Sequence, residues 1–178
     1  MSAKNNFVFT LLTILSWIIF IGLSIEAGSL IFIFIIKLLR PEFLSPIYNQ
    51  IDLSLLYSSS QAAYYAMYSF VMAIALMKAH LFYVVVRLLS KLDLTKPFNP
   101  FVAAQIGKIS YFTLSIGLVS FIARQSAKNL LHRGNPVEQL NQFWVDSQAY
   151  ILMAAVIYII ATIFKKGIAL QNEYDLTV

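Results

Sequence analysis

The sequence contains no cysteine and only two histidines. This excludes disulfides, thiolate metal centres and cysteine nucleophiles, and it leaves too few histidines for a histidine-rich metal site. Charged residues are scarce as well, at 12% of the chain against about 25% in ordinary soluble domains. The net charge is +5, but the basic residues are scattered singly between apolar runs, so direct binding of nucleic acid is not expected.

Apolar side chains are abundant instead. They make up 60% of the 178 residues, and the mean hydropathy is +0.75. A chain of this size cannot hide so much apolar surface inside a water-soluble globule, because small domains keep a large part of their surface exposed. The excess is expected to face lipid, which predicts an integral membrane protein whose first partner is the bilayer.

Four segments are long enough and apolar enough to cross a membrane, which takes about 20 residues of helix. We place them at residues 7–36, 62–89, 102–123 and 147–166, followed by a tail at residues 167–178 that is expected to be disordered or lightly packed. This predicts an all-α membrane fold, a single-domain four-helix transmembrane bundle with short interfacial helices in the connections.

Two local signals predict helix starts between these segments. Asn99 followed by Pro100 is typical of a helix start, because an N-cap side chain precedes proline at the first helical position. Ser45 and Pro46 predict, in the same way, a short helix that lies on the membrane.

Tyrosine and basic residues indicate where the membrane surfaces lie. Tyr64, Tyr65 and Tyr68 are expected among the lipid headgroups, with their hydroxyls in water. With four segments the chain ends share one side, and seven basic residues are expected there: Lys4, Arg87, Lys91, Lys96, Lys108, Lys165 and Lys166. Five are expected on the other side: Lys37, Arg40, Arg124, Lys128 and Arg133. Because basic residues favour the cytoplasmic side, both ends are predicted to be cytoplasmic.

Several stretches carry a family resemblance. Residues 78–83 read Lys-Ala-His-Leu-Phe-Tyr, residues 91–98 read Lys-Leu-Asp-Leu-Thr-Lys-Pro-Phe, and residues 108–111 read Lys-Ile-Ser-Tyr. Residues 163–178 contain a Lys-Lys-Gly step and close with Asp-Leu-Thr-Val. On these residues the chain resembles, over nearly its whole length, the family called domain of unknown function 2975.

The resemblance implies a small four-helix bacterial membrane protein, which places it in the cytoplasmic membrane. It also implies a partner, because members of this family are often encoded beside a small helix-turn-helix regulator of the Cro type. It establishes no activity and therefore carries over no catalytic residue.

Ionisable residues at bilayer depth are costly, so they are the first places to look for function. Glu26 lies in the first segment, and Lys78 and His80 lie in the second. Glu26 and Lys78 are close enough in depth to form an ion pair, which would either specify the fold or mark a proton or ligand site. His80 points to nearly the opposite side of the helix from Lys78, as a satisfied neutral histidine or as a pH-responsive group.

Small residues that share a helix face predict close packing, because they let two backbones approach. One such face lies on the third segment: Ser110, Thr113, Gly117 and Ser120. Two lie on the first segment: Gly22, Glu26 and Ser29, and the pair Ser24 and Gly28. Arg124 and Asp146 are expected to form an exposed ion pair between the third and fourth segments.

Two functions are compatible with the sequence. The first is a non-enzymatic regulatory or sensory membrane protein that contacts a cytoplasmic transcriptional regulator. The residues expected to make this contact are Asp93, Lys96, Pro97, Phe98, Asp175, Leu176 and Val178. The alternative is a small transporter or channel component, in which Glu26, Lys78 and His80 line a polar route. No arrangement of residues predicts an enzyme, no cofactor or metal is expected, and a homo-oligomer is left open.

Overall fold

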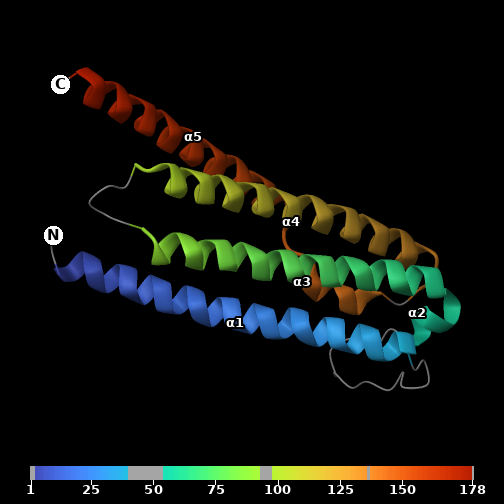
Figure 1. Cartoon of the computed structure of the whole chain (residues 1–178). Helices are drawn as coiled ribbons and strands as arrows, with labels where there is room; N and C mark the ends of the chain where they lie inside the picture. Colours follow the sequence, from blue (N-terminus) through green and yellow to red (C-terminus); the bar gives the residue numbers. More distant parts are fainter. Residues whose placement is uncertain (1–2, 40–53, 93–97, 136, 178) are drawn as a thin grey trace.

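The computed structural model describes residues 3–39, 54–92, 98–135 and 137–177. Its elements are α1 (Ala3–Leu39), α2 (Ser54–Ser59), α3 (Gln61–Ser90), α4 (Pro100–His132), the 3₁₀ helix η1 (Glu138–Phe143) and α5 (Ser147–Thr177). α1, α3, α4 and α5 are long, apolar and packed as a bundle (Figure 1). The predicted all-α fold is therefore confirmed, and α2 and η1 are short helices in the connections.

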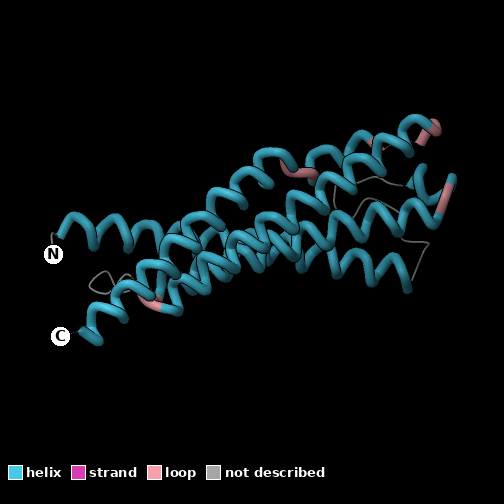
Figure 2. The backbone as a smooth tube through the Cα atoms, turned by 90° about the horizontal axis from the view of Figure 1, so that it is seen from above, coloured by secondary structure: helices cyan, strands magenta, loops and turns pink. Residues whose placement is uncertain are grey.

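The four long helices are arranged in a row in the order of the chain. α1 packs on α3, α3 on α4, and α4 on α5, with the most extensive contact between α4 and α5. Within the described residues, α1 and α5 do not contact each other. The start of α1 and the end of α5 lie at the same end of the bundle, here called the terminal end, and α2 and η1 lie at the other, the far end (Figures 1 and 2).

Each long helix can span a membrane by length and composition. α1 has 37 residues, which is about 55 Å at helical rise, so it must tilt or protrude from roughly 30 Å of hydrocarbon. α5 continues as a helix through residues 167–177. Of the two expected states of this tail, disordered or lightly packed, disorder is therefore wrong for these residues, whereas the exposure of residues 169–173 agrees with light packing. Gly167 does not end the helix because its φ is not positive, unlike that of Gly134, which is +82° just beyond the end of α4.

The helix starts are set by polar side chains. Asn99 accepts a hydrogen bond from the backbone N–H of Val102 at 2.9 Å, with Pro100 in the first turn, as predicted. Asp146 plays the same part for α5, because its Oδ1 accepts from the backbone N–H groups of Gln148 and Ala149 at 3.1 and 3.3 Å.

The expected ion pair between Arg124 and Asp146 is wrong. Arg124 instead donates a hydrogen bond to the backbone oxygen of Val145 at 3.1 Å, and no ion pair joins it to Asp146 among the described residues. The carboxylate of Asp146 is engaged by the start of its own helix. Arg124 therefore fastens α4 to the chain just before α5 through a carbonyl.

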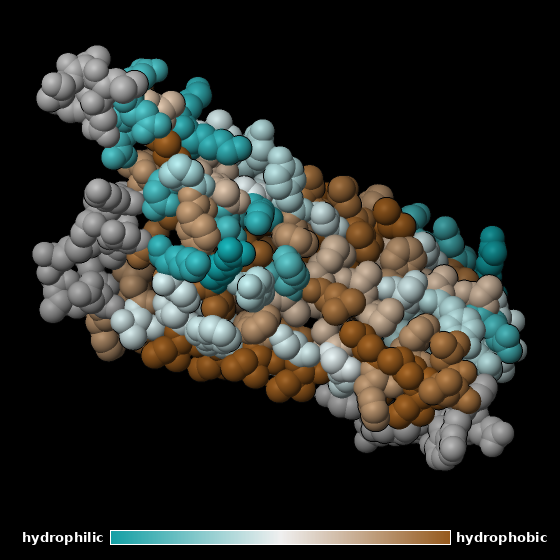
Figure 3. All heavy atoms as spheres, in the orientation of Figure 1, coloured by the Kyte–Doolittle hydropathy of each residue, from teal (hydrophilic) through white to brown (hydrophobic). Residues whose placement is uncertain are grey.

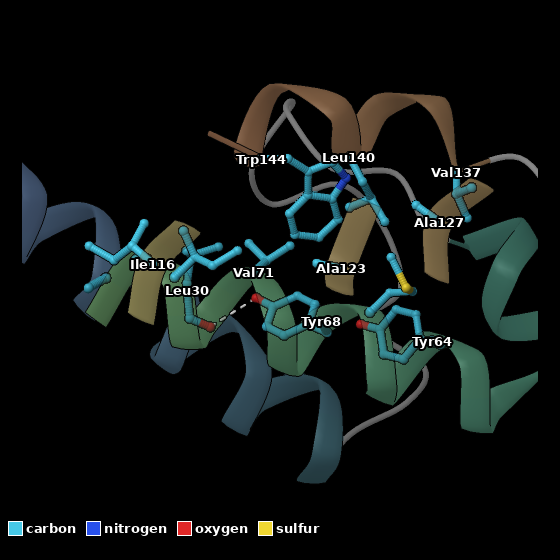
Figure 4. Packing of buried hydrophobic residues seen from close by; sticks show 14 of the residues in the cluster. Leu30, Tyr64, Tyr68, Val71, Ile116, Ala123, Ala127, Val137, Leu140 and Trp144 are labelled. Atoms are coloured by element: carbon cyan, nitrogen blue, oxygen red, sulfur yellow. Dashed lines mark hydrogen bonds between the residues drawn. The ribbon is translucent and has the colours of Figure 1, made fainter. Parts of the chain in front are cut away.

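The best-packed part of the core lies toward the far end and is aromatic (Figure 4). Tyr64 and Tyr68 of α3 are only 1% and 2% exposed, under Trp144 and Leu140. The Tyr68 hydroxyl donates to the backbone oxygen of Leu30 in α1 at 2.9 Å. The expectation that the hydroxyls of Tyr64 and Tyr68 lie in water is therefore wrong, because both are buried and side chains of neighbouring helices, among them Phe34 of α1 and Tyr57 of α2, pack against these rings.

α2 continues this core. Its Leu56 is fully buried, and Tyr57 packs edge-on against Tyr64. The helix start predicted at Ser45 and Pro46 lies outside the described residues.

The small residues of α4 pack against α5, as predicted. Ser110, Thr113, Gly117 and Ser120 are all buried. Ser110 donates a hydrogen bond to the backbone oxygen of Ala154 at 2.9 Å. The facing residues of α5 are also small and recur every seven positions: Ser147, Ala154 and Ala161. This spacing is typical of two helices that meet along one seam.

The small residues of α1 do not behave this way. A Cβ built on Gly22 or Gly28 would meet nothing within 4 Å, so the close packing expected at these glycines is wrong. α1 instead meets α3 along neighbouring positions, with Ser16, Ala27 and Leu30 buried. The spacings between these buried residues fit a seven-residue repeat. The face of α1 that they form is shifted by one residue along the chain from the face of Gly22 and Glu26.

Candidate functional site

Glu26 and Lys78 are on the same side of the contact between α1 and α3. Glu26 is exposed, Lys78 is half-buried, and the two charges attract each other. They do not reach ion-pair distance within the part of the chain that the structure describes. Glu26 is one position before Ala27, the residue of α1 that packs on α3, which explains why its carboxylate lies at the border of the contact rather than inside it.

His80 belongs to a different contact. Its ring lies 4.4 Å from the ring of Phe112 in α4 and 5.9 Å from that of Tyr83, measured between centroids. Lys78 faces the charge on α1, whereas His80 stacks on α4, as expected for positions about 200° apart on a helix. The charges of Glu26 and Lys78 are thus near enough to attract each other without forming an ion pair, and His80 lies apart from them. Over the described ranges, no group of three His, Asp or Glu could hold a metal ion.

The predicted partner surface is described only in part. Asp93, Lys96, Pro97 and Val178 lie outside the described residues. Asp175 and Leu176 belong to the last turn of α5. Phe98, just before α4, lies within the described residues and contacts α5.

Phe98 lies against α5 at the terminal end. Its ring is 5.2 Å from that of Phe164, and a Cβ built on Gly167 would lie 2.8 Å from Phe98 Cδ1. Glycine at position 167 therefore makes room for an aromatic ring, which gives the Lys-Lys-Gly step a structural reason. Phe98 and Gly167, which lie in two segments that the sequence analysis expected to contact a partner, therefore touch each other here.

Beyond this contact, α5 extends outward on its own (Figure 1). Residues 168–177 are helical, and Gln171, Asn172 and Glu173 are exposed. The ten residues add about 15 Å of helix after Gly167. We call residues 168–177 the α5 extension.

Sequence reasoning missed one feature of the terminal end. Arg87 and Lys91, at the end of α3, both lie over the ring of Phe101 in the first turn of α4. The signal was present in the spacing, because residues four apart share a helix face and the connection to α4 is short.

The distribution of residue types agrees with a membrane-spanning protein. Hydrophobic residues dominate along α1, and hydrophilic residues gather at the ends of the bundle (Figure 3). Apolar side chains on the outer faces of all four long helices are exposed, which suits lipid contact. Fold and surface together define a multi-pass membrane protein with four candidate transmembrane helices.

The chain belongs to the family described as "Protein of unknown function (DUF2975)", whose model matches residues 41–178. The match includes α2 to α5 and therefore both the Lys78 region and the terminal-end contacts of Phe98. The resemblance inferred from the sequence motifs is thus confirmed over this range. No curated protein and no solved structure matches the chain.

Proposed function

We propose that this protein is a non-enzymatic regulatory or sensory component of the bacterial cytoplasmic membrane. Its terminal end faces the cytoplasm, and there it holds a small soluble transcriptional regulator of the helix-turn-helix type. Regulation works by sequestration and release of that regulator at the membrane.

The α5 extension is the observation that carries this proposal. Residues 169–173 of the extension are all exposed, so this stretch of helix buries little apolar surface and is a poor structural element by itself. A helix with exposed polar side chains at a membrane surface is, however, well suited to contact a soluble protein. The terminal end also carries the larger number of basic residues, which favours the cytoplasmic side.

The contact between Phe98 and Gly167 supports a link between the membrane part and this surface. Because Phe98 precedes α4 and Gly167 belongs to α5, a change in the angle between the two helices would alter this contact. The extension begins at the next residue, so a change inside the bilayer would reach the partner surface without any long connection.

A transport function has weaker support. Glu26 and Lys78 attract each other at one side of α3, whereas His80 stacks on Phe112 of α4. The ionisable side chains therefore do not follow one path across the bundle. If they served transport all the same, Glu26→Gln and Lys78→Met would abolish flux into reconstituted vesicles.

The proposal is tested by site-specific photocrosslinking in cells. A photoreactive residue at Asn172, in the α5 extension, is compared with one at Glu138, in η1 at the far end; both positions are exposed. We expect Asn172 to form an adduct with a small helix-turn-helix protein, identified by mass spectrometry, and Glu138 to form none. Deletion of residues 168–178 should release that protein from the membrane fraction and change the transcripts of its target genes.

Two results would contradict the proposal. One is the absence of any soluble adduct at Asn172 while the full-length protein is present in the membrane. The other is an unchanged set of transcripts after the deletion. The variant Gln171→Ala, which leaves the extension in place, controls for loss of the protein through truncation.

A further inference from the structure

Two cations converge on one aromatic ring at the terminal end. The Cζ atom of Arg87 lies 5.7 Å and the Nζ atom of Lys91 5.6 Å from the centre of the Phe101 ring. Each cation is attracted to the ring, but the ring carries no net charge and does not neutralise them. The two like charges therefore remain close together and repel each other.

No protein anion balances this pair among the described residues. Neither Arg87 nor Lys91 forms an ion pair there, and both side chains are exposed. Lys108 is also exposed and lies seven positions after Phe101, on the same face of α4. It lies about 10 Å further along the helix, and its flexible side chain is long enough to shorten this distance when it extends toward the membrane surface.

The apolar surroundings continue from this cluster toward the bilayer. His80 is seven positions before Arg87 and so shares its face of α3, and its ring stacks on Phe112 of α4. If the headgroups of one leaflet lie at the terminal end, these cations lie on the headgroup side of the aromatic side chains. This order of polar and apolar groups matches that of a phospholipid.

We propose that Arg87, Lys91 and Lys108, arranged around Phe101, bind the phosphate group of an anionic phospholipid in the leaflet at the terminal end. Guanidinium and ammonium groups form strong charge-assisted hydrogen bonds with phosphate oxygens. Basic clusters between transmembrane helices are sites where such headgroups bind. The bound headgroup joins the end of α3 to the start of α4. This site does not depend on the proposed soluble partner.

The test uses the full-length protein in nanodiscs of phosphatidylcholine mixed with phosphatidylglycerol, followed by native mass spectrometry of the released protein. The double variant Arg87→Gln with Lys91→Gln is compared with Lys165→Gln with Lys166→Gln, which removes two exposed cations of α5 at the same end. We expect the first variant to retain phosphatidylglycerol at least about tenfold less than the unaltered protein. The second variant should retain it as the unaltered protein does.

Three results would overturn the proposal. If both double variants lost phosphatidylglycerol equally, the lipid would be held by a general attraction of basic residues to an anionic surface rather than by this site. Equal retention of phosphatidylcholine and phosphatidylglycerol by the unaltered protein would mean that the site does not select the anionic headgroup. Displacement of the lipid by inorganic phosphate, with equal stabilisation of the protein, would mean that the site binds the free anion.

Phe101→Leu, which keeps every charge, should weaken retention of phosphatidylglycerol less than the Arg87 and Lys91 double variant does, because the ring only positions the cations.

Discussion

Gly117 of α4 faces Ile151 of α5 so closely that a Cβ built on the glycine would lie 3.1 Å from Ile151 Cγ1 and 3.3 Å from its backbone nitrogen. The two helices therefore approach so closely here that even a Cβ at position 117 would require the facing atoms of α5 to shift by a few tenths of an ångström. Because the nearby atoms include backbone, a larger side chain cannot be accommodated by rotating one neighbour. α5 itself would have to move.

The variant Gly117→Leu is expected to lower the free energy of unfolding by about 1–3 kcal/mol through overpacking. Gly107→Leu is a matched control in the same helix, since a Cβ there would meet nothing within 4 Å and glycine is a weak helix former. Thermal denaturation in detergent should show a lower midpoint temperature for Gly117→Leu than for the unaltered protein, and no decrease for Gly107→Leu. Equal stability of the two variants would mean that α4 and α5 are less close than described.

Tyr68→Phe removes the hydroxyl that donates to the backbone oxygen of Leu30. The expected cost is about 1 kcal/mol, typical of one hydrogen bond between helices. Tyr83→Phe is the control, because the Tyr83 side chain is 43% exposed and its hydroxyl makes no hydrogen bond within the described residues. Unfolding in a denaturing detergent, followed by circular dichroism, measures both. A larger effect for Tyr83→Phe than for Tyr68→Phe would contradict the buried position of Tyr68.

Asp146→Ala removes the side chain that accepts two backbone N–H groups at the start of α5. Loss of such a cap typically costs about 1 kcal/mol. Asp146→Asn retains the accepting oxygen and should restore most of the stability. If Asp146 instead acted by pairing with a cation, the asparagine variant would be as unstable as the alanine variant, and stability would depend on salt concentration.

Reporters fused to the two ends of the chain should report the same compartment, because α1 begins and α5 ends at the terminal end of the bundle (Figure 1). A single cysteine at Glu138 should react with an impermeant maleimide in intact cells, and a single cysteine at Asn172 only after permeabilisation. The absence of native cysteine makes this labelling unambiguous. Labelling of both positions in intact cells would refute the arrangement.

The sequence was a good guide to the class of fold and to one helix contact. Charge-free apolar stretches predicted the long helices, and Asn99 with Pro100 predicted the start of α4. The face of Ser110 and Gly117 was correctly assigned to packing, because small polar residues repeat along one side of the helix.

Other features depended on contacts between distant segments. Gly22 and Gly28 belong to two faces that were both predicted to pack, but spacing does not say which face of α1 meets α3, and residues at neighbouring positions, such as Ala27 and Leu30, are the buried ones. Tyr64 looks like a membrane-surface residue in the sequence, but in the structure the ring of Tyr57 in α2 packs against it. The α5 extension was missed because polar composition was read as the end of the helix, although Gly167 alone does not stop one.

The row of helices leaves α5 attached along one side only. Gly167 packs against the Phe98 ring, so the ten residues that follow it would act as a lever with its pivot at this contact. A tilt of about 10° around that pivot, of the kind that a thinner or thicker bilayer imposes on a helix, would carry the tip sideways by about 2.6 Å. A thickness change too small to alter the packing inside the bundle would thus be amplified into a movement that a soluble protein can detect.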